Sequence, residues 1–196
     1  TWQPPVPGSD SGGGISNTAA YSVDPCMDLN PITNQPGVVW TDRDTVGGDL
    51  EIFMRESDGA AFQELALSGS GTGLSNNPTS SQFPDIAYDI TGRPVVAWQD
   101  LDAAEGDADI YVRRFDAGAW GELAGSATGS GVSANTSSST GPSVEINPVT
   151  GQPGVAWVDF SLGDFEIFFR EFDGAAWQQL AKSGQYQGVS NNTGVS

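Results

Sequence analysis

The stretch GVAWVDFSLGDFEIFFREFDGAAW, residues 154–177, decides the fold because the chain contains it in three copies. Residues 37–62 read GVVWTDRDTVGGDLEIFMRESDGAAF, and residues 95–120 read VVAWQDLDAAEGDADIYVRRFDAGAW. Repetition at a fixed period indicates a structural unit that stacks on copies of itself.

The spacing of unlike residues supports the repeat. Trp40, Trp98 and Trp157 are 58 and 59 residues apart. A second motif occurs four times, as GISN at 14–17, GLSN at 73–76, GVSAN at 131–135 and GVSN at 188–191. Because different residue types keep one offset, the period belongs to the whole unit.

Each unit contains four short apolar runs separated by turn residues. In the second unit they are PDIAYD (84–89), RPVVAWQD (93–100), DIYVRRFD (109–116) and AWGELA (119–124). Apolar and polar residues alternate with period two, and β-branched and aromatic residues dominate. We therefore predict strands and almost no helix.

Four antiparallel strands in about 58 residues, repeated, are typical of β-propeller blades. Both faces of each run carry apolar residues, as expected for a blade packed between two neighbours. The predicted fold is an all-β propeller of four-stranded antiparallel blades, with three blades and one extra outer strand in this chain. The alternative is a β-sandwich, in which each sheet has one wet face.

The phase of the repeat sets the expected boundaries, because Trp2 lies 60 residues before Phe62, which opens a fourth strand. Three blades do not close a propeller, which typically has four to eight. We expect association with further blades, either copies of the chain or neighbouring blades of a longer one. The expected segments are an outer strand of a preceding blade plus linker at 1–19, blades at 20–77, 78–136 and 137–186, and a connector to the next blade at 187–196.

Composition excludes several classes of function. The net charge is −18, from 25 acidic and 7 basic residues, which argues against nucleic acid as a partner. No apolar window approaches the roughly 18 residues of a membrane helix, so no membrane insertion is expected. The chain has no histidine, which excludes histidine-dependent triads and makes zinc improbable. Its one cysteine, Cys26, allows no disulfide within the chain.

The segments 94–100 and 109–116, with Trp120, resemble bacterial secreted β-propeller repeats of about 60 residues, with a TolB-like or sialidase-like blade pattern. The resemblance covers nearly the whole chain and implies the propeller fold and an extracellular or cell-surface location. The FDGAAW stretch resembles the sialidase Asp-box but lacks its Ser-x-Asp-x-Gly spacing. It fits a hairpin turn with Asp-Gly at its tip.

Three arginines, Arg55, Arg113 and Arg170, occupy one position of the repeat. If the three side chains converged on one anion, they would suggest a sialidase. Because all three units repeat the position, we favour a structural brace inside or between blades. The expected partners are the acidic residues that end the preceding strand, Asp42, Asp100 and Asp159.

Acidic turns are the candidate metal sites, because hard cations need several oxygen ligands and Asp-rich turns supply them. The alternative is a solvated turn whose first Asp pairs with the arginine. No cofactor is expected other than calcium at these turns. The candidate ligands are Asp42, Asp44 and Asp49; Asp100, Asp102 and Asp107; and Asp159 and Asp164.

The aromatic residues divide into two groups. Trp40, Trp98 and Trp157 alternate with apolar residues on strand faces, so we predict core positions. Trp2, Trp120 and Trp177 open the fourth strands at the rim of the blades and are candidate carbohydrate-binding residues. The alternative is that they pack over the adjacent strand.

The favoured function is a non-enzymatic structural or interaction module, because the repeats are nearly interchangeable and catalysis requires unlike residues at one site. The alternative is a glycan-binding lectin with equivalent pockets in each blade. A carboxylate-dependent glycosidase is the third hypothesis.

Overall fold

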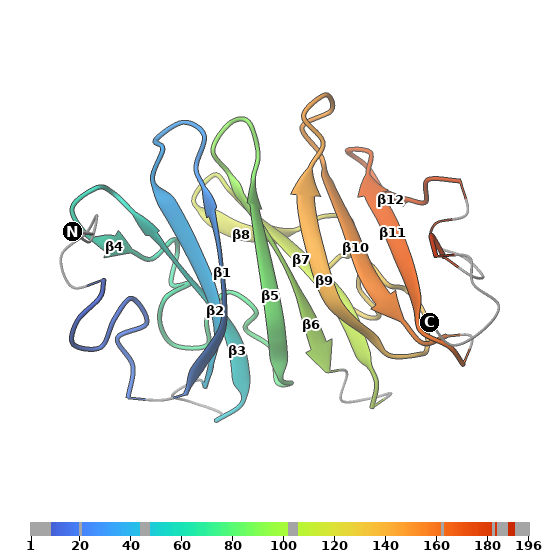
Figure 1. Ribbon diagram of the computed structural model, residues 1–196, viewed down its shortest axis with the longest axis horizontal. Coiled ribbons are helices and arrows are strands. Elements are labelled where there is room, and N and C mark those ends of the chain that lie inside the picture. Colours follow the sequence, from blue (N-terminus) through green and yellow to red (C-terminus); the bar gives the residue numbers. More distant parts are fainter. Residues whose placement is uncertain are drawn as a thin grey trace.

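The computed structural model describes residues 9–19, 21–43, 48–101, 106–161, 163–181, 183 and 188–190. Within these residues, twelve β-strands form three four-stranded sheets, which succeed one another across the molecule from the N-terminal side to the C-terminal side (Figure 1). In the part of the chain so described, no helix is long and apolar enough to cross a membrane.

Each sheet contains four consecutive strands of the chain, and we refer to each sheet as a blade. Blade 1 contains β1 (Ser22–Leu29), β2 (Pro36–Arg43), β3 (Leu50–Ser57) and β4 (Phe62–Gln63). Blade 2 contains β5 (Ser81–Tyr88), β6 (Pro94–Leu101), β7 (Ala108–Asp116) and β8 (Ala119–Glu122). Blade 3 contains β9 (Ser139–Ile146), β10 (Pro153–Asp159), β11 (Glu166–Phe172) and β12 (Trp177–Gln178).

The strands of each blade pair antiparallel in chain order, so every connection within a blade is a hairpin. This arrangement confirms the predicted fold class of four-stranded antiparallel blades. The outer strand predicted at the start of the chain falls largely on residues 1–8, which lie outside the described residues. Residues 9–19 form turns and no strand.

Each blade has two apolar faces because its strands alternate with period two. On the face that we call leading, Trp98 lies opposite Tyr111, with ring centroids 6.0 Å apart. The face that we call trailing carries Ala97, Ile110 and Val112. Trp98 is fully buried, and its equivalents in blades 1 and 3 are also buried, which confirms the predicted core positions.

The blades pack leading face onto trailing face, and the core lies between them. One buried cluster joins Ile52 and Met54 of blade 1 to Trp98 of blade 2. The other joins Ile110 of blade 2 to Trp157 of blade 3. A blade between two neighbours buries apolar surface on both of its faces. Its strands therefore lack the solvent-exposed polar face that the strands of a β-sandwich have.

The first strands of the three blades lie next to one another (Figure 1). Each has a bulge at a residue with positive φ that precedes a proline: Asp24, Phe83 and Gly141. Side chains link these strands, because the Asp85 carboxylate accepts the Cys26 thiol at 2.9 Å and the Val144 amide at 2.8 Å. Burial, and then the contact with Asp85, raises the pKa of Cys26 to about 11.

Candidate functional site

The connectors between blades carry the repeated glycine–serine motif, and their backbone explains it. Gly73 has a φ of +64°, and a Cβ there would lie 2.2 Å from the carbonyl oxygen of Ile52. The close approach lets the Leu74 amide donate to that carbonyl at 2.7 Å. The motif therefore holds each connector against the third strand of the blade that it leaves.

The three arginines join adjacent blades through these connectors. The Arg113 Nη1 of blade 2 donates to the carbonyl of Leu74 at 2.5 Å, and Arg170 of blade 3 donates to Val132 at 2.7 Å. Arg55 donates in the same way to Ile15 at 2.6 Å. Each guanidinium thus holds a third strand to the connector before its own blade.

The prediction that these arginines pair with Asp42, Asp100 and Asp159 was wrong. Among the described residues, the arginine side chains form no ion pair with the carboxylates that end β2, β6 and β10. Burial lowers the pKa of Arg113, and nearby carboxylates such as Glu122 and Asp100 oppose that shift. A backbone carbonyl accepts the guanidinium because the connector lies nearer to it than the carboxylate does.

The carboxylate at the end of the second strand has a different role, as Asp100 shows. It accepts Trp98 Nε1 at 3.0 Å, Ser81 Oγ at 2.7 Å and Thr79 Oγ1 at 2.6 Å, and it also accepts the side-chain amide of Asn77. Asp42 and Asp159 accept equivalent tryptophan and serine donors. These buried carboxylates therefore tie the core tryptophan to the first strand.

Sequence reasoning missed a second buried carboxylate in each blade. Asp109 lies directly opposite Asp100 on β7 and accepts Ser133 Oγ of the connector at 2.7 Å. Glu51 accepts Ser75, and Glu166 accepts Ser190. The repeated letters EIF, DIY and EIF, in which the acid shares a face with the buried aromatic residue, were the available signal.

The predicted calcium ligands lie mainly in the acidic turns. Asp44 and Asp102 fall outside the described residues. Asp49, Asp107 and Asp164 are partly exposed, and both carboxylate oxygens of Asp107 are buried without a hydrogen-bond partner. No group of three or more acidic or cysteine side chains that could hold a metal ion occurs within the described ranges. Calcium binding stays a prediction.

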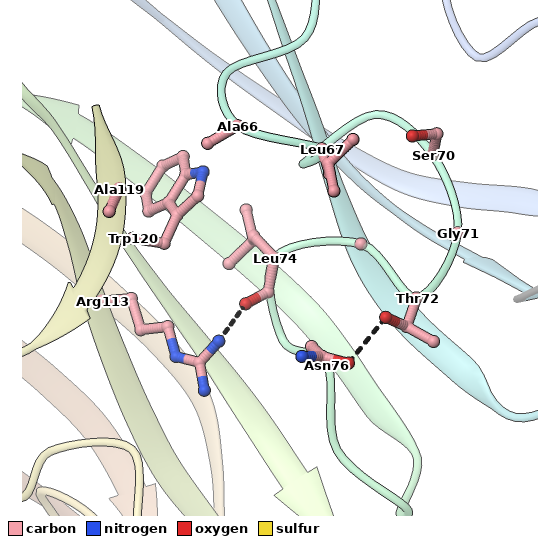
Figure 2. A pocket seen from close by; sticks show the side chains of 11 residues that line it. Ala66, Leu67, Ser70, Gly71, Thr72, Leu74, Asn76, Arg113, Ala119 and Trp120 are labelled. Carbon is pink, nitrogen blue, oxygen red and sulfur yellow. Dashed lines mark hydrogen bonds between the residues drawn. The ribbon is translucent and has the colours of Figure 1, made fainter.

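A pocket of about 450 Å³ lies between blades 1 and 2 (Figure 2). Trp120 of β8 and Arg113 of β7 form one wall of the pocket. The connector from blade 1 forms the other wall, and its Leu74 lies beside Trp120 and Arg113. The pocket is lined by Ala66, Leu67, Ser70, Gly71, Thr72, Gly73, Leu74, Asn76, Arg113, Ala119 and Trp120.

Contacts on both sides fix the position of the Trp120 ring. Its Nε1 donates to the Leu65 carbonyl of blade 1 at 2.9 Å, and its ring lies 5.4 Å from that of Phe115. Trp177 makes the equivalent bond to Leu123 at 2.9 Å. Both predicted rim tryptophans therefore pack across a blade boundary, and Trp120 also lines the pocket. Trp2 lies outside the described residues.

The same kind of pocket occurs one repeat earlier. A pocket of about 320 Å³ lies between residues 9–17 and the start of β4. Ile15 occupies the place of Leu74, Asn17 that of Asn76, and Phe62 that of Trp120. The pocket is therefore a product of the repeat.

Comparison with known proteins finds similarity to solved structures only, since no protein-family model and no curated protein matches the sequence. A family 117 glycoside hydrolase of the marine bacterium Zobellia galactanivorans matches with a TM-score of 0.53 and 13% identity, over 86% of this chain and 58% of that one. A structure from the GH130 family, described as containing glycoside hydrolases that target β-1,2 mannosidic linkages in Candida mannan, matches with 0.53 and 13%, over 85% and 50%. A microbial sialidase matches with 0.52 and 12%, over 83% and 34%.

These similarities support the β-propeller fold and correct one prediction. The chain spans 58% or less of the length of each of these structures. At such low identity, the likeness shows the fold alone. The prediction that the chain is not an enzyme was nevertheless wrong, because it treated the repeated blade as evidence against catalysis. Solved glycoside hydrolases share this architecture.

Proposed function

We propose that the chain is a carbohydrate-binding β-propeller module whose binding sites recur between blades. The observation that carries this proposal is the pocket at Trp120 and its repetition at Phe62. We propose an extracellular or cell-surface location, where such ligands are abundant.

The lining of the pocket at Trp120 suits a sugar ring. An indole held at its edge by the Leu65 carbonyl offers a rigid apolar surface to the C–H face of a pyranose. Ser70, Thr72 and Asn76 add hydroxyl and amide groups that can bind sugar hydroxyls. The glycan-directed activities of the solved glycoside hydrolases with this fold favour the same class of ligand.

Binding can be tested with methyl glycosides of mannose, galactose, glucose, fucose and sialic acid. We expect saturable binding of at least one of them by calorimetry, with a Kd on the order of 1 mM. Leu67→Asn removes an apolar side chain at the pocket. Asparagine tolerates the positive φ of +67° at this position, so the backbone should not change. Trp120→Phe shrinks the aromatic surface.

We expect both variants to weaken binding several-fold. Val149→Asn is the matched control, because Val149 lies on the β9–β10 turn and is 92% exposed. The absence of saturable binding at about 10 mM of every probe would contradict the proposal. So would unchanged affinity in Leu67→Asn and Trp120→Phe proteins that retain their thermal stability.

A second candidate function is the completion of a propeller by further blades. It is favoured by Ile167 on the trailing face of blade 3, which is 41% exposed, whereas Ile52 and Ile110 at the equivalent positions are fully buried. Since apolar area gains stability on leaving water, this face favours contact with a further blade.

A further inference from the structure

The trailing face of blade 3 exposes side chains that the other two blades bury. Ile167, Leu180 and Val189 are 41%, 53% and 57% exposed. Equivalent side chains are at most 7% exposed in five positions that a following blade covers, Ile52, Ile110, Leu123, Leu74 and Val132, and the remaining equivalent, Leu65, is partly buried. The exposed face of blade 3 thus has the composition of an interface between blades.

The leading face of blade 1 is exposed in a complementary way. Met27 and Leu29 of β1 are 53% and 47% exposed. Their equivalents in β5, Ile86 and Tyr88, are 4% and 6% exposed because they pack against blade 1. The two ends of the described array therefore present the two halves of one interface.

A cavity beside Trp40 marks where a trailing face would fit. The cavity has a volume of about 220 Å³, and Ile15, Val23, Val38 and Trp40 supply most of its apolar lining. At the equivalent place between blades 1 and 2, aliphatic side chains of blade 1 pack against Trp98. The leading face of blade 1 thus has a space of the kind that a trailing face fills.

Residues 9–19 occupy the position of a connector at this face. The Ile15 carbonyl accepts Arg55 as the Leu74 carbonyl accepts Arg113, and Thr18 donates to Asp42 at 2.9 Å. Val189 holds the same place on blade 3, where its amide donates to the Ile167 carbonyl. Ile15 and Val189 thus occupy equivalent positions of the repeat at the two ends of the described array.

We propose that the leading face of blade 1 in one copy docks on the trailing face of blade 3 in a second copy. The proposal rests on the second candidate function and names its partner. The carbonyl of Val189 then replaces that of Ile15 as the acceptor of Arg55 in the other copy. The match follows from the two interfaces inside the chain, where these same faces already pack. Two such contacts would join six blades, within the usual range for a closed propeller.

The mass of the chain in solution tests this proposal. We expect light scattering and sedimentation to give twice the chain mass of 20.4 kDa at micromolar concentration. Ile167→Glu and Leu180→Glu place charge on an exposed apolar face, so we expect folded proteins that dimerise at least ~10-fold more weakly. Ile90→Glu is the control and should dimerise normally, because Ile90 is 64% exposed on the β5–β6 turn of blade 2, which carries neither docking face.

A covalent fusion of two copies distinguishes docking by a second copy from completion of the propeller by further blades. Residues 1–190 followed directly by residues 17–196 keep the repeat in phase and cover the trailing face of the first blade 3 covalently. A single chain that stays at 20.4 kDa at millimolar concentration overturns docking by a second copy. If the joined chain then melts at a higher temperature than the single chain, completion by further blades still holds. If it does not, both proposals fail.

Discussion

Asp100 shows how one buried carboxylate organises a blade. The residue is 1% exposed and accepts hydrogen bonds from four side chains. These donors come from its own strand, from the start of β5 and from the connector. A carboxylate is suited to this position because both of its oxygens accept and neither competes as a donor.

Replacing Asp100 by Asn should destabilise the fold. The new amide group is a donor placed among donors, so at least one buried group loses its partner. We expect a loss of about 2–3 kcal/mol in the free energy of unfolding, measured with urea. Asp116→Asn is the control, because Asp116 is exposed and forms only a surface ion pair with Arg93. Equal stability of the two variants would contradict the role assigned to Asp100.

The hairpin between the third and fourth strands depends on an aspartate at its start. In blade 1, the Asp58 carboxylate accepts the amides of Ala60 at 2.8 Å and Ala61 at 2.7 Å. Asp173 makes the same bonds in blade 3. The Asp-Gly turn predicted from the sequence is therefore held by the side chain as well as by the glycine.

Titration of these turns should affect stability at low pH. The Ala61 and then the Ala60 amide lower the pKa of Asp58 below its ordinary value of 3.8, and Asp173 is shifted in the same direction by Ala176 and Ala175. A lowered folded-state pKa contributes stability above the unfolded-state pKa, and that contribution is lost as pH falls through the folded-state value.

The double variant Asp58→Ala/Asp173→Ala should therefore melt below the natural chain at pH 7. We expect the difference in Tm to shrink as pH falls from about 4 towards 2, where the carboxyl groups become protonated. Melting curves across this range provide the measurement. A difference in Tm that stays constant with pH would assign the effect to the backbone of the turn instead.

At the scale of the whole molecule, stacking and charge act in opposite directions. Apolar faces pack blade on blade, while the 25 acidic and 7 basic residues leave a net charge of −18. Self-repulsion of this size opposes a compact state and opposes contact between copies. Salt screens that repulsion over a distance of about 10 Å at 0.1 M.

We therefore expect added sodium chloride to stabilise the chain. Raising its concentration from about 10 mM to about 500 mM should increase the Tm by several degrees, because repulsion between acidic side chains is screened. The same change should favour dimerisation at fixed protein concentration. Calorimetry and light scattering supply the two measurements, and a Tm that falls with salt would show that attractive ion pairs dominate.

Much of the fold could be predicted from the sequence because its signals are local. Period-two alternation, Asp-Gly turns and a repeat of 58 or 59 residues specify strands, hairpins and blades. The burial of Trp40, Trp98 and Trp157 followed from their place in that alternation. The partner of the arginines did not follow, because Arg113 and Leu74 are 39 residues apart and meet only when two blades stack.

The sequence by itself thus determined the blade, its strand order and its turns, since each depends on residues close together in the chain. Only the tertiary structure decided which carboxylates are buried, where the pocket beside Trp120 lies, and which faces stay exposed. These depend on how one blade packs against the next. In three nearly identical repeats, Ile52, Ile110 and Ile167 look alike, and only the presence of a following blade separates the buried residues from the exposed one.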